Sequence, residues 1–200
     1  VAALVVADGQ GHPCDMTDRI PLAAVIGHPI AHSLSPRVHG HWLRRYGVPG
    51  YYIPMDVAPD RLADVLRTMP SMGFVGANVT IPHKETVLRL ADSVTDRAAL
   101  IGAANTVTFR SDGSFQADNT DGAGFMENLR QSAPDWSPRI GPAAVFGAGG
   151  AARAIIVALL DAGVPEIRLT NRTRARAEAL RQEFGAKVVV QDWVGAANIV

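Results

Sequence analysis

The feature that most constrains this chain of 200 residues is a glycine-rich turn between an expected strand and an expected helix. The apolar run Ala143–Phe146 leads into Gly147-Ala148-Gly149-Gly150-Ala151-Ala152, and an alanine-rich helical stretch follows. In this context the pattern G-x-G-x-x-(G/A) predicts a dinucleotide phosphate loop, with first-turn N–H groups directed at the anion. Gly147 would make the tight turn, Gly149 would let a pyrophosphate approach the backbone, and Ala152 would let helix and strand pack closely. The alternative is a loop whose glycines only turn and cap the chain.

The next expected strand, Glu166–Asn171, ends where a dinucleotide fold contacts the adenosine ribose. An NAD site of this kind usually places Asp or Glu there, but this chain continues Asn171-Arg172-Thr173-Arg174-Ala175-Arg176. A carboxylate would repel a 2′-phosphate, whereas the planar guanidinium of arginine binds phosphate in a bidentate way. The segment therefore favours NADP over NAD. The alternative is a solvated start of helix Arg174–Phe184 with Thr173 as N-cap, although cations at a helix N-terminus oppose the helix dipole.

The amino-acid composition argues against some classes of binding partner. The chain has 19 Lys and Arg and 19 Asp and Glu, so its formal net charge is zero, which speaks against nucleic acid or an anionic membrane surface as a partner. No apolar run reaches the length of a membrane-spanning helix. Cys14 is the one cysteine and cannot form an internal disulfide, so the expected compartment is the reducing cytoplasm. The sequence leaves open whether the chain forms a homodimer.

Before the glycine-rich turn, the sequence predicts an α/β substrate domain. Apolar strand patterns alternate with amphipathic helical patterns, an order typical of a mostly parallel sheet. The expected strands are 21–27, 51–57, 74–81, 106–109 and 115–119, and the expected helices are 36–46, 59–69, 83–90, 95–101 and 123–129. In the first of these helices, Val38, Trp42 and Tyr46 are expected to form the inward apolar stripe.

The proline-rich segment 132–142 is the expected linker between domains. We expect an extension over 1–18, a substrate-binding catalytic domain over 19–131 and a Rossmann-type NADP-binding domain over 143–200. Met16 is a candidate translation start. The apolar stretch 196–200 resembles a strand, and only the first of two mononucleotide halves precedes it, so the natural protein is expected to be longer.

Several polar residues of the first domain are candidates for chemistry. Ser33 and Ser35 would place two hydroxyls on one side of an extended segment, a suitable clamp for a small anion, although Ser35 is also an expected N-cap before Pro36. Lys84 lies in the first turn of a helix, where an exposed lysine is the simpler interpretation. Asp121 is equally suited to cap the helix that follows it. No metal site is expected, because Pro29 disfavours a helix through the two histidines on either side of it.

Six short motifs follow one another in a fixed order, and each of them alone is weak. They are Ser33-Leu-Ser-Pro36, Asn78-Val-Thr-Ile-Pro-His-Lys84, Gly102-Ala-Ala-Asn-Thr106, Asn119-Thr-Asp-Gly-Ala-Gly124, Gly147-Ala-Gly-Gly150 and Asn171-Arg-Thr173. Together they resemble the shikimate dehydrogenase family over about residues 20–200. The resemblance implies a cytoplasmic enzyme of aromatic amino-acid biosynthesis that reduces 3-dehydroshikimate to shikimate with NADPH. It also implies later cofactor-domain segments and a C-terminal helix that these 200 residues do not contain.

The resemblance assigns roles residue by residue. The serines that hold the substrate carboxylate match Ser33 and Ser35, and the polar groups that bind the ring substituents match Asn78, Thr80 and Asn105. The catalytic pair matches Lys84 and Asp121. The phosphate loop matches Gly147, Ala148, Gly149, Gly150 and Ala151, and the contacts to the 2′-phosphate and adenine match Asn171, Arg172, Thr173 and Arg176.

The chemistry of the implied reaction agrees with these residue types. Hydride reduction of a ring ketone leaves an alkoxide, which needs a cation and a proton at the oxygen. Lys84 can supply both, and Asp121 can orient its ammonium group.

Two other functions stay open at this stage. A quinate/shikimate or aminoquinate dehydrogenase would share nearly all ring contacts, and the absence of an acid near Asn171 speaks against an NAD-preferring quinate enzyme. A non-catalytic sensor of the same metabolite would tolerate loss of the proton donor, so the presence of both Lys84 and Asp121 speaks against it.

Overall fold

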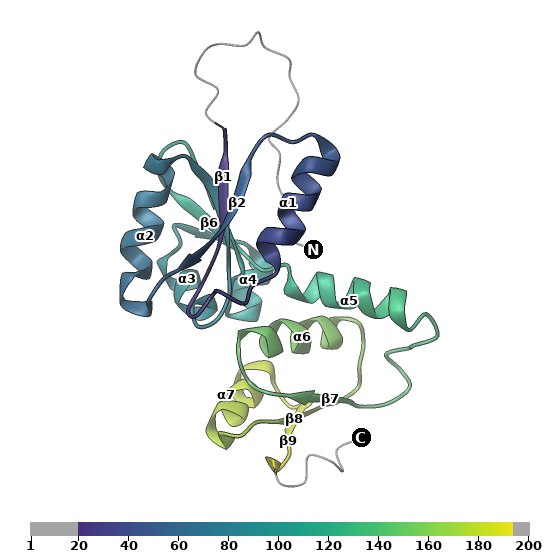
Figure 1. Ribbon diagram of the computed structural model, residues 1–200. Coiled ribbons are helices and arrows are strands. Elements are labelled where there is room, and N and C mark those ends of the chain that lie inside the picture. Colours follow the sequence, from purple (N-terminus) through teal and green to yellow (C-terminus); the bar gives the residue numbers. More distant parts are fainter. Residues whose placement is uncertain (1–19, 194–200) are drawn as a thin grey trace. The chain divides into compact units, whose positions relative to one another are not determined.

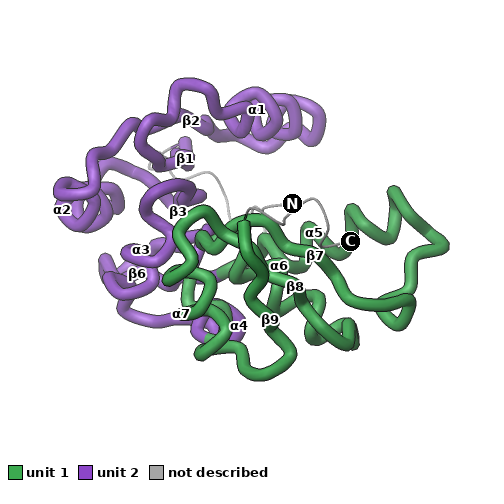
Figure 2. The backbone as a smooth tube through the Cα atoms, turned by 90° about the horizontal axis from the view of Figure 1, so that it is seen from below, with its two compact units in different colours: residues 1, 100–103, 119–200 green, residues 2–99, 104–118 purple. Residues whose placement is uncertain are grey.

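The protein is described here by a computed structural model, which describes residues 20–193. The expected extension over 1–18, Cys14, the candidate start at Met16 and the apolar stretch 196–200 lie outside the described residues. The chain divides into two compact units, shown in two colours in Figure 2. The described part of the N-terminal unit comprises residues 20–99 and 104–118, and that of the C-terminal unit comprises 100–103 and 119–193.

The N-terminal unit is built on a six-stranded sheet with the order β2-β1-β3-β5-β6-β4 (Figure 1). Its strands are β1 Leu22–Gly27, β2 Tyr51–Asp56, β3 Phe74–Val79, β4 Ser93–Val94, β5 Thr106–Phe109 and β6 Phe115–Asp118. The pairs β1–β2, β1–β3 and β4–β6 are parallel, whereas β5 runs antiparallel to both β3 and β6. Strand β1 lies between β2 and β3 and is a continuous apolar run. This is expected for a parallel strand that is covered on both faces.

Helices connect the strands and cover the sheet. They are α1 Ser35–Tyr46, α2 Leu62–Thr68, α3 Lys84–Leu90 and α4 Asp96–Ile101, with 3-10 turns Pro59–Arg61 and Met69–Met72 flanking α2. Figure 1 shows α1 on one side of β1 and β2, and α2 with α3 on the other. The helix expected over 59–69 is therefore one α-helix between two tighter turns. The apolar spacing of this segment predicts that Leu62, Val65, Leu66 and Met69 face inward. Leu62, Leu66 and Met69 are fully buried in the core of this unit, and Val65 is partly buried against it.

The inward face of α1 differs from the expected one. Val38 and Tyr46 are exposed, and the helix buries none of its residues fully. Trp42, the third expected inward residue, is partly buried as expected, and the other partly buried positions include His39 and Leu43, which lie one turn apart on the helix. The stripe is rotated because His39 stacks on the ring of Tyr52 in β2, a tertiary contact that the apolar pattern does not contain.

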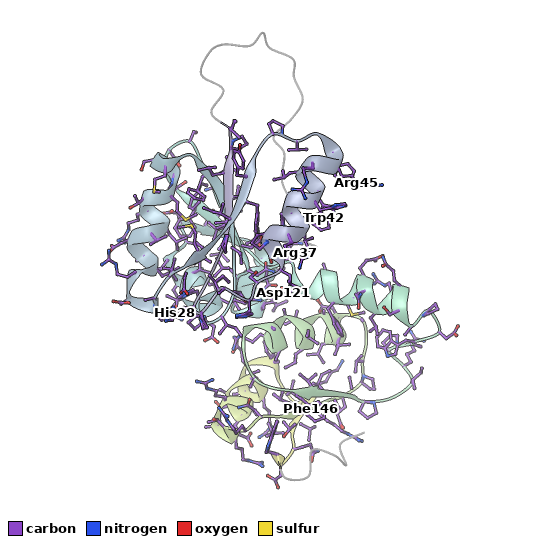
Figure 3. All side chains as sticks on the ribbon, viewed as in Figure 1. His28, Arg37, Trp42, Arg45, Asp121 and Phe146 are labelled. Carbon is purple, nitrogen blue, oxygen red and sulfur yellow. The ribbon has the colours of Figure 1, made fainter. Side chains whose placement is uncertain are left out.

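The C-terminal unit is a three-stranded parallel sheet with three helices. Strands β7 Ala143–Phe146, β8 Ile167–Thr170 and β9 Val188–Val190 pair in the order β7-β8-β9. The helices are α5 Asp121–Ser132, α6 Gly150–Asp161 and α7 Arg174–Phe184. This is one mononucleotide-binding half of a doubly wound fold, with β7 at the sheet edge. Phe146, the last residue of β7, is exposed (Figure 3).

The division into units differs from the expected domain boundaries. Helix α5, expected to close the substrate domain, belongs to the C-terminal unit, and so does the segment 100–103. The physical reason is packing: Met126 of α5 is buried in one core cluster with Ile156 and Ile167. Trp136, within the expected linker 132–142, packs against the same cluster. The described helices include none that is long and apolar enough to cross a membrane.

One buried histidine at the start of α3 predicts a pH dependence of stability. His83 is 1% exposed, its Nε2–H donates to the Val57 carbonyl at 2.8 Å, and burial lowers the pKa of the ring below its usual value. The unfolded chain therefore takes up a proton at a higher pH than the folded chain, so stability should fall as pH drops below about 6.5. We expect the Tm of the wild type to fall more steeply over this range than that of His83→Gln, whose amide can keep the bond to Val57. Parallel Tm curves for the two proteins would refute this.

Candidate active site

Most of the expected substrate residues lie at one edge of the N-terminal sheet. Ser33 and Ser35 follow β1, Asn78 is near the end of β3, and Thr80 and Lys84 come directly after β3. Asn105 precedes β5, which runs antiparallel to β3 and so begins at the same edge. The carboxyl ends of parallel strands are where open α/β sheets bind ligands. The fold thus brings six separated polar residues to one edge of one unit.

The two serines lie at the start of α1 in an arrangement that differs from the expected cap. Helix α1 begins at Ser35 itself, Leu34 occupies the cap position, and no side chain caps the helix there. Ser33 Oγ accepts a bond from the Ser35 N–H at 3.3 Å, so Ser33 satisfies the donor that would otherwise be open. The prediction that Ser35 is the N-cap is therefore wrong by one residue. Both hydroxyls lie beside a helix N-terminus, which is favourable for a carboxylate.

Asn78 is the centre of a small polar network. The Tyr52 hydroxyl donates to Asn78 Oδ1 at 2.7 Å, and Asn78 Nδ2 faces the Asn105 carbonyl and the Thr106 hydroxyl at 3.4 and 3.5 Å. The Thr106 hydroxyl donates to Asn105 Oδ1 at 2.8 Å. These side chains are only partly buried, so the network borders solvent and is accessible to a small polar ligand.

Lys84 is the first residue of α3, and the main chain around it is held firmly. The preceding residue is the buried His83, and the Lys84 carbonyl accepts a bond from the Ala104 N–H at 2.8 Å. The Asn105 carbonyl in turn accepts from the Val79 N–H at 2.8 Å. The start of α3 and the segment that carries Asn105 are therefore joined by main-chain hydrogen bonds. This rigid connection is what a positioned proton donor requires.

Asp121 belongs to the C-terminal unit and is the first residue of α5 (Figure 3). Its N–H donates to Asn119 Oδ1 at 3.0 Å, while Asn119 is buried and donates its own amide to the Ala103 carbonyl at 2.8 Å. The cap position is Thr120, and its side chain makes no capping bond. The interpretation of Asp121 as an N-cap is therefore wrong. The role of Asp121 in catalysis stays a prediction.

The glycine-rich segment forms the expected turn between β7 and α6. Gly147 has φ +107°, a conformation that residues with a side chain rarely adopt, and its N–H donates to the Thr170 carbonyl at 2.8 Å. Gly149 is the residue before α6, and a Cβ built there would meet no atom within 4 Å. Ala152 is buried against the core, as expected for the third position of the pattern. Open space above a helix N-terminus suits the pyrophosphate of a dinucleotide.

The basic segment after β8 also has the geometry of a phosphate site. Asn171 Nδ2 donates to the Thr173 carbonyl at 2.8 Å, which shapes the turn into α7. Thr173 occupies the cap position of α7, but its side chain makes no capping bond. Arg174 forms ion pairs with Glu178 and Asp192. Within residues 20–193 no ion pair involves Arg172 or Arg176, and both are exposed. These two guanidinium groups are the ones suited to a 2′-phosphate.

Family models of known proteins match both the N-terminal and the C-terminal part of the chain. The family model described as shikimate dehydrogenase substrate binding domain matches residues 25–107, and that described as shikimate / quinate 5-dehydrogenase matches residues 139–195. A solved structure of shikimate 5-dehydrogenase from Thermus thermophilus in complex with NADP(H) and shikimate is 39% identical, with a TM-score of 0.75. The match covers 87% of this chain and 68% of that one. The chain belongs to the shikimate dehydrogenase family.

Two further relatives differ in their named substrate and in their similarity to this chain. The shikimate dehydrogenase (NADP(+)) of Cereibacter sphaeroides strain ATCC 17025 is 71% identical over 182 residues, which are 91% of this chain and 65% of the relative. The chain thus spans somewhat less than two thirds of the length of this curated family member. Quinate dehydrogenase from Corynebacterium glutamicum in complex with NAD is 28% identical with a TM-score of 0.80, over 90% of this chain and 66% of that one.

Two residues of the polar edge were not expected from the sequence. Tyr52 and His39 contact Asn78 and the Ser35 carbonyl, respectively, yet neither stands out in the pattern. Tyr52 follows Tyr51, and only strand alternation, which assigns one of two adjacent tyrosines to each face, hints at its role. The functions of the remaining expected site residues stay predictions.

Proposed function

We propose that this protein is an NADP-dependent shikimate dehydrogenase that catalyses the reversible reduction of 3-dehydroshikimate to shikimate. The observation that supports the proposal is that one chain contains residues suited to bind the substrate and residues suited to bind the cofactor. A polar edge with two serine hydroxyls, two asparagine side chains and a lysine at the start of α3 lies in the N-terminal unit. A phosphate loop and two arginines without ion pairs among the described residues lie in the C-terminal unit.

The substrate side would bind through groups of matched chemistry. Ser33 and Ser35 donate hydroxyl hydrogens to the carboxylate, and because both groups are neutral, no buried charge is left unpaired when the ligand is absent. Asn78, Thr80 and Asn105 bind ring hydroxyls, because amides and hydroxyls both donate and accept. The substrate is thereby held with its ring ketone toward the residue that protonates it.

The chemical step needs a proton at the ketone oxygen. When bound, NADPH supplies a hydride to the ring carbonyl carbon. The Lys84 ammonium stabilises the negative charge that develops on the oxygen and transfers a proton to it. The family motifs assign Asp121 as the second member of the catalytic pair. In the oxidative direction the same pair takes up the hydroxyl proton.

The cofactor side would select NADP through Arg172 and Arg176. Replacing both by Ala should raise the KM for NADP about tenfold or more per arginine, because a hydrogen bond to a charged group is worth about 1.5–3 kcal/mol. The KM for NAD, which lacks the 2′-phosphate, should change little. Arg174→Ala is the matched control, since Arg174 already pairs with Glu178 and Asp192. Equal losses with NADP and NAD would contradict the assignment.

The proposal is tested by following nicotinamide absorbance with the complete gene product. Shikimate and quinate are each combined with NADP and with NAD. Turnover with shikimate and NADP as the preferred pair supports the proposal. Preference for quinate or NAD would assign the protein to the quinate branch of the family, and shikimate binding without any turnover would indicate a sensor.

A further inference from the structure

Tyr52 holds the position of Asn78 across the sheet. Strand β1 separates β2 from β3, with Ala23 paired to Tyr52 on one side and Val25 paired to Asn78 on the other. Ala23 and Val25 are two residues apart, so the Tyr52 and Asn78 side chains extend from the same face. The phenol spans the width of β1 and donates to Asn78 Oδ1 at 2.7 Å.

The surrounding groups fix which end of the Asn78 amide faces which way. Nδ2 faces the Asn105 carbonyl at 3.4 Å, and a carbonyl only accepts hydrogen bonds, so this end of the amide must be the donor. Oδ1 must then face Tyr52. The bonds from Nδ2 to Asn105 and Thr106 are long and weak, whereas the bond from Tyr52 is short. Tyr52 is thus the strongest constraint on the amide, and a ligand oxygen would replace one of the two long bonds from Nδ2.

Tyr52 is itself held in place by α1. The His39 ring stacks on the phenol with 3.9 Å between ring centroids and an interplanar angle of 4°. His39 Nδ1 donates to the Ser35 carbonyl at 2.9 Å, which ties the stack to the turn that carries the two serines. Burial raises the pKa of the Tyr52 phenol, and a hydrogen bond from Ser35 opposes this only in part, so the hydroxyl keeps its proton and remains a donor.

We propose that Tyr52 is a positioning residue for substrate binding: its hydroxyl fixes the Asn78 amide so that Nδ2 donates to an oxygen of the substrate ring, and His39 fixes the phenol. The inference rests on the proposed function, in which Asn78 binds the ring. Without the Tyr52 hydroxyl the amide is held only by the two long bonds from Nδ2, so its plane can rotate away from the ligand. Binding then loses both the orientation and the selectivity of this contact.

The test compares two tyrosine variants of adjacent residues in the complete gene product. Tyr52→Phe should raise the KM for shikimate about five- to tenfold, the effect of losing one oriented hydrogen bond, while kcat stays within about twofold. Tyr51→Phe removes the same atom from a side chain that is 61% exposed and should leave both constants unchanged. Equal KM values for Tyr52→Phe and wild type would overturn the inference.

A double-mutant cycle separates positioning from a general loss of structure. In an Asn78→Ala background, Tyr52→Phe should add less than about twofold to KM, because the group that it orients is gone. Equal factors in both backgrounds, or a fall in Tm that accompanies the loss of binding, would overturn the inference while leaving the proposed function intact. No turnover of shikimate by the wild type would overturn the proposed function and this inference with it.

Discussion

Lys84→Ala should lower kcat for shikimate oxidation by about 10³-fold, within the range that general acid–base catalysis contributes. The substitution removes both the cation and the transferable proton at the oxygen on which charge develops. Because the proposed carboxylate and ring contacts come from other residues, the affinity for shikimate measured by calorimetry should change little. The loss would therefore appear in kcat and kcat/KM together, as expected for an interaction made only in the transition state.

The chain offers a close control for this experiment. Lys84 and Lys187 are its two lysines, and Lys187 is exposed before β9 in the C-terminal unit. Lys187→Ala should leave kcat, KM and Tm unchanged. The main-chain bond between Lys84 and Ala104 does not involve the side chain, so Lys84→Ala should also keep its fold and Tm. A Lys84→Ala enzyme with near-normal turnover would show that Lys84 is only a residue at the start of a helix.

The sequence is a good guide where the signals are local. Strand β1 lies within one residue of the expected range, and α7 has the expected ends Arg174 and Phe184, because apolar runs and turn residues mark both elements. The tight turn between β7 and α6 is also as expected, because the backbone conformation of Gly147 favours glycine. Strands β4 and β9, with two and three residues, are not among the expected elements, since such short runs carry no periodic signal.

Features that depend on contacts between distant residues could not be predicted in the same way. In a helix as polar as α1, the sequence allows more than one set of residues to face inward. The stacking of His39 on Tyr52 determines which set does. Helix α5 looks like the last element of the first domain, but Met126 packs into the second core. The residues that hold Asn78 come from β2 and from the loop before β5, and no spacing in the sequence connects them.

Gly76→Ala should be among the most destabilising single substitutions in the N-terminal unit. Gly76 lies in β3 opposite Thr108 of β5, and a Cβ at this position would lie 2.5 Å from the Val107 carbonyl oxygen. The obstructing atom is main chain, so no side-chain rotation relieves the clash, and the β3–β5 pair must separate. Overpacking typically costs about 1–3 kcal/mol, and we expect the upper end here because the obstructing atom is main chain. The loss is measurable as a lower urea midpoint at an unchanged m-value.

The same substitution should also damage substrate binding, because the two strands that it separates carry the polar edge. Asn78 is two residues beyond Gly76 in β3, and Thr106 pairs with Asn78 at the start of β5. We therefore expect the KM for shikimate to rise in the folded fraction of Gly76→Ala, while the KM for NADP, whose proposed site lies in the other unit, stays the same. Gly141→Ala is the control, since a Cβ there meets no atom within 4 Å, and its stability should stay within about 0.5 kcal/mol of the wild type. A Gly76→Ala protein with wild-type stability would show that β3 and β5 can separate without cost. The pairing of Asn78 with Thr106 would then not be needed to keep the polar residues of this edge in place.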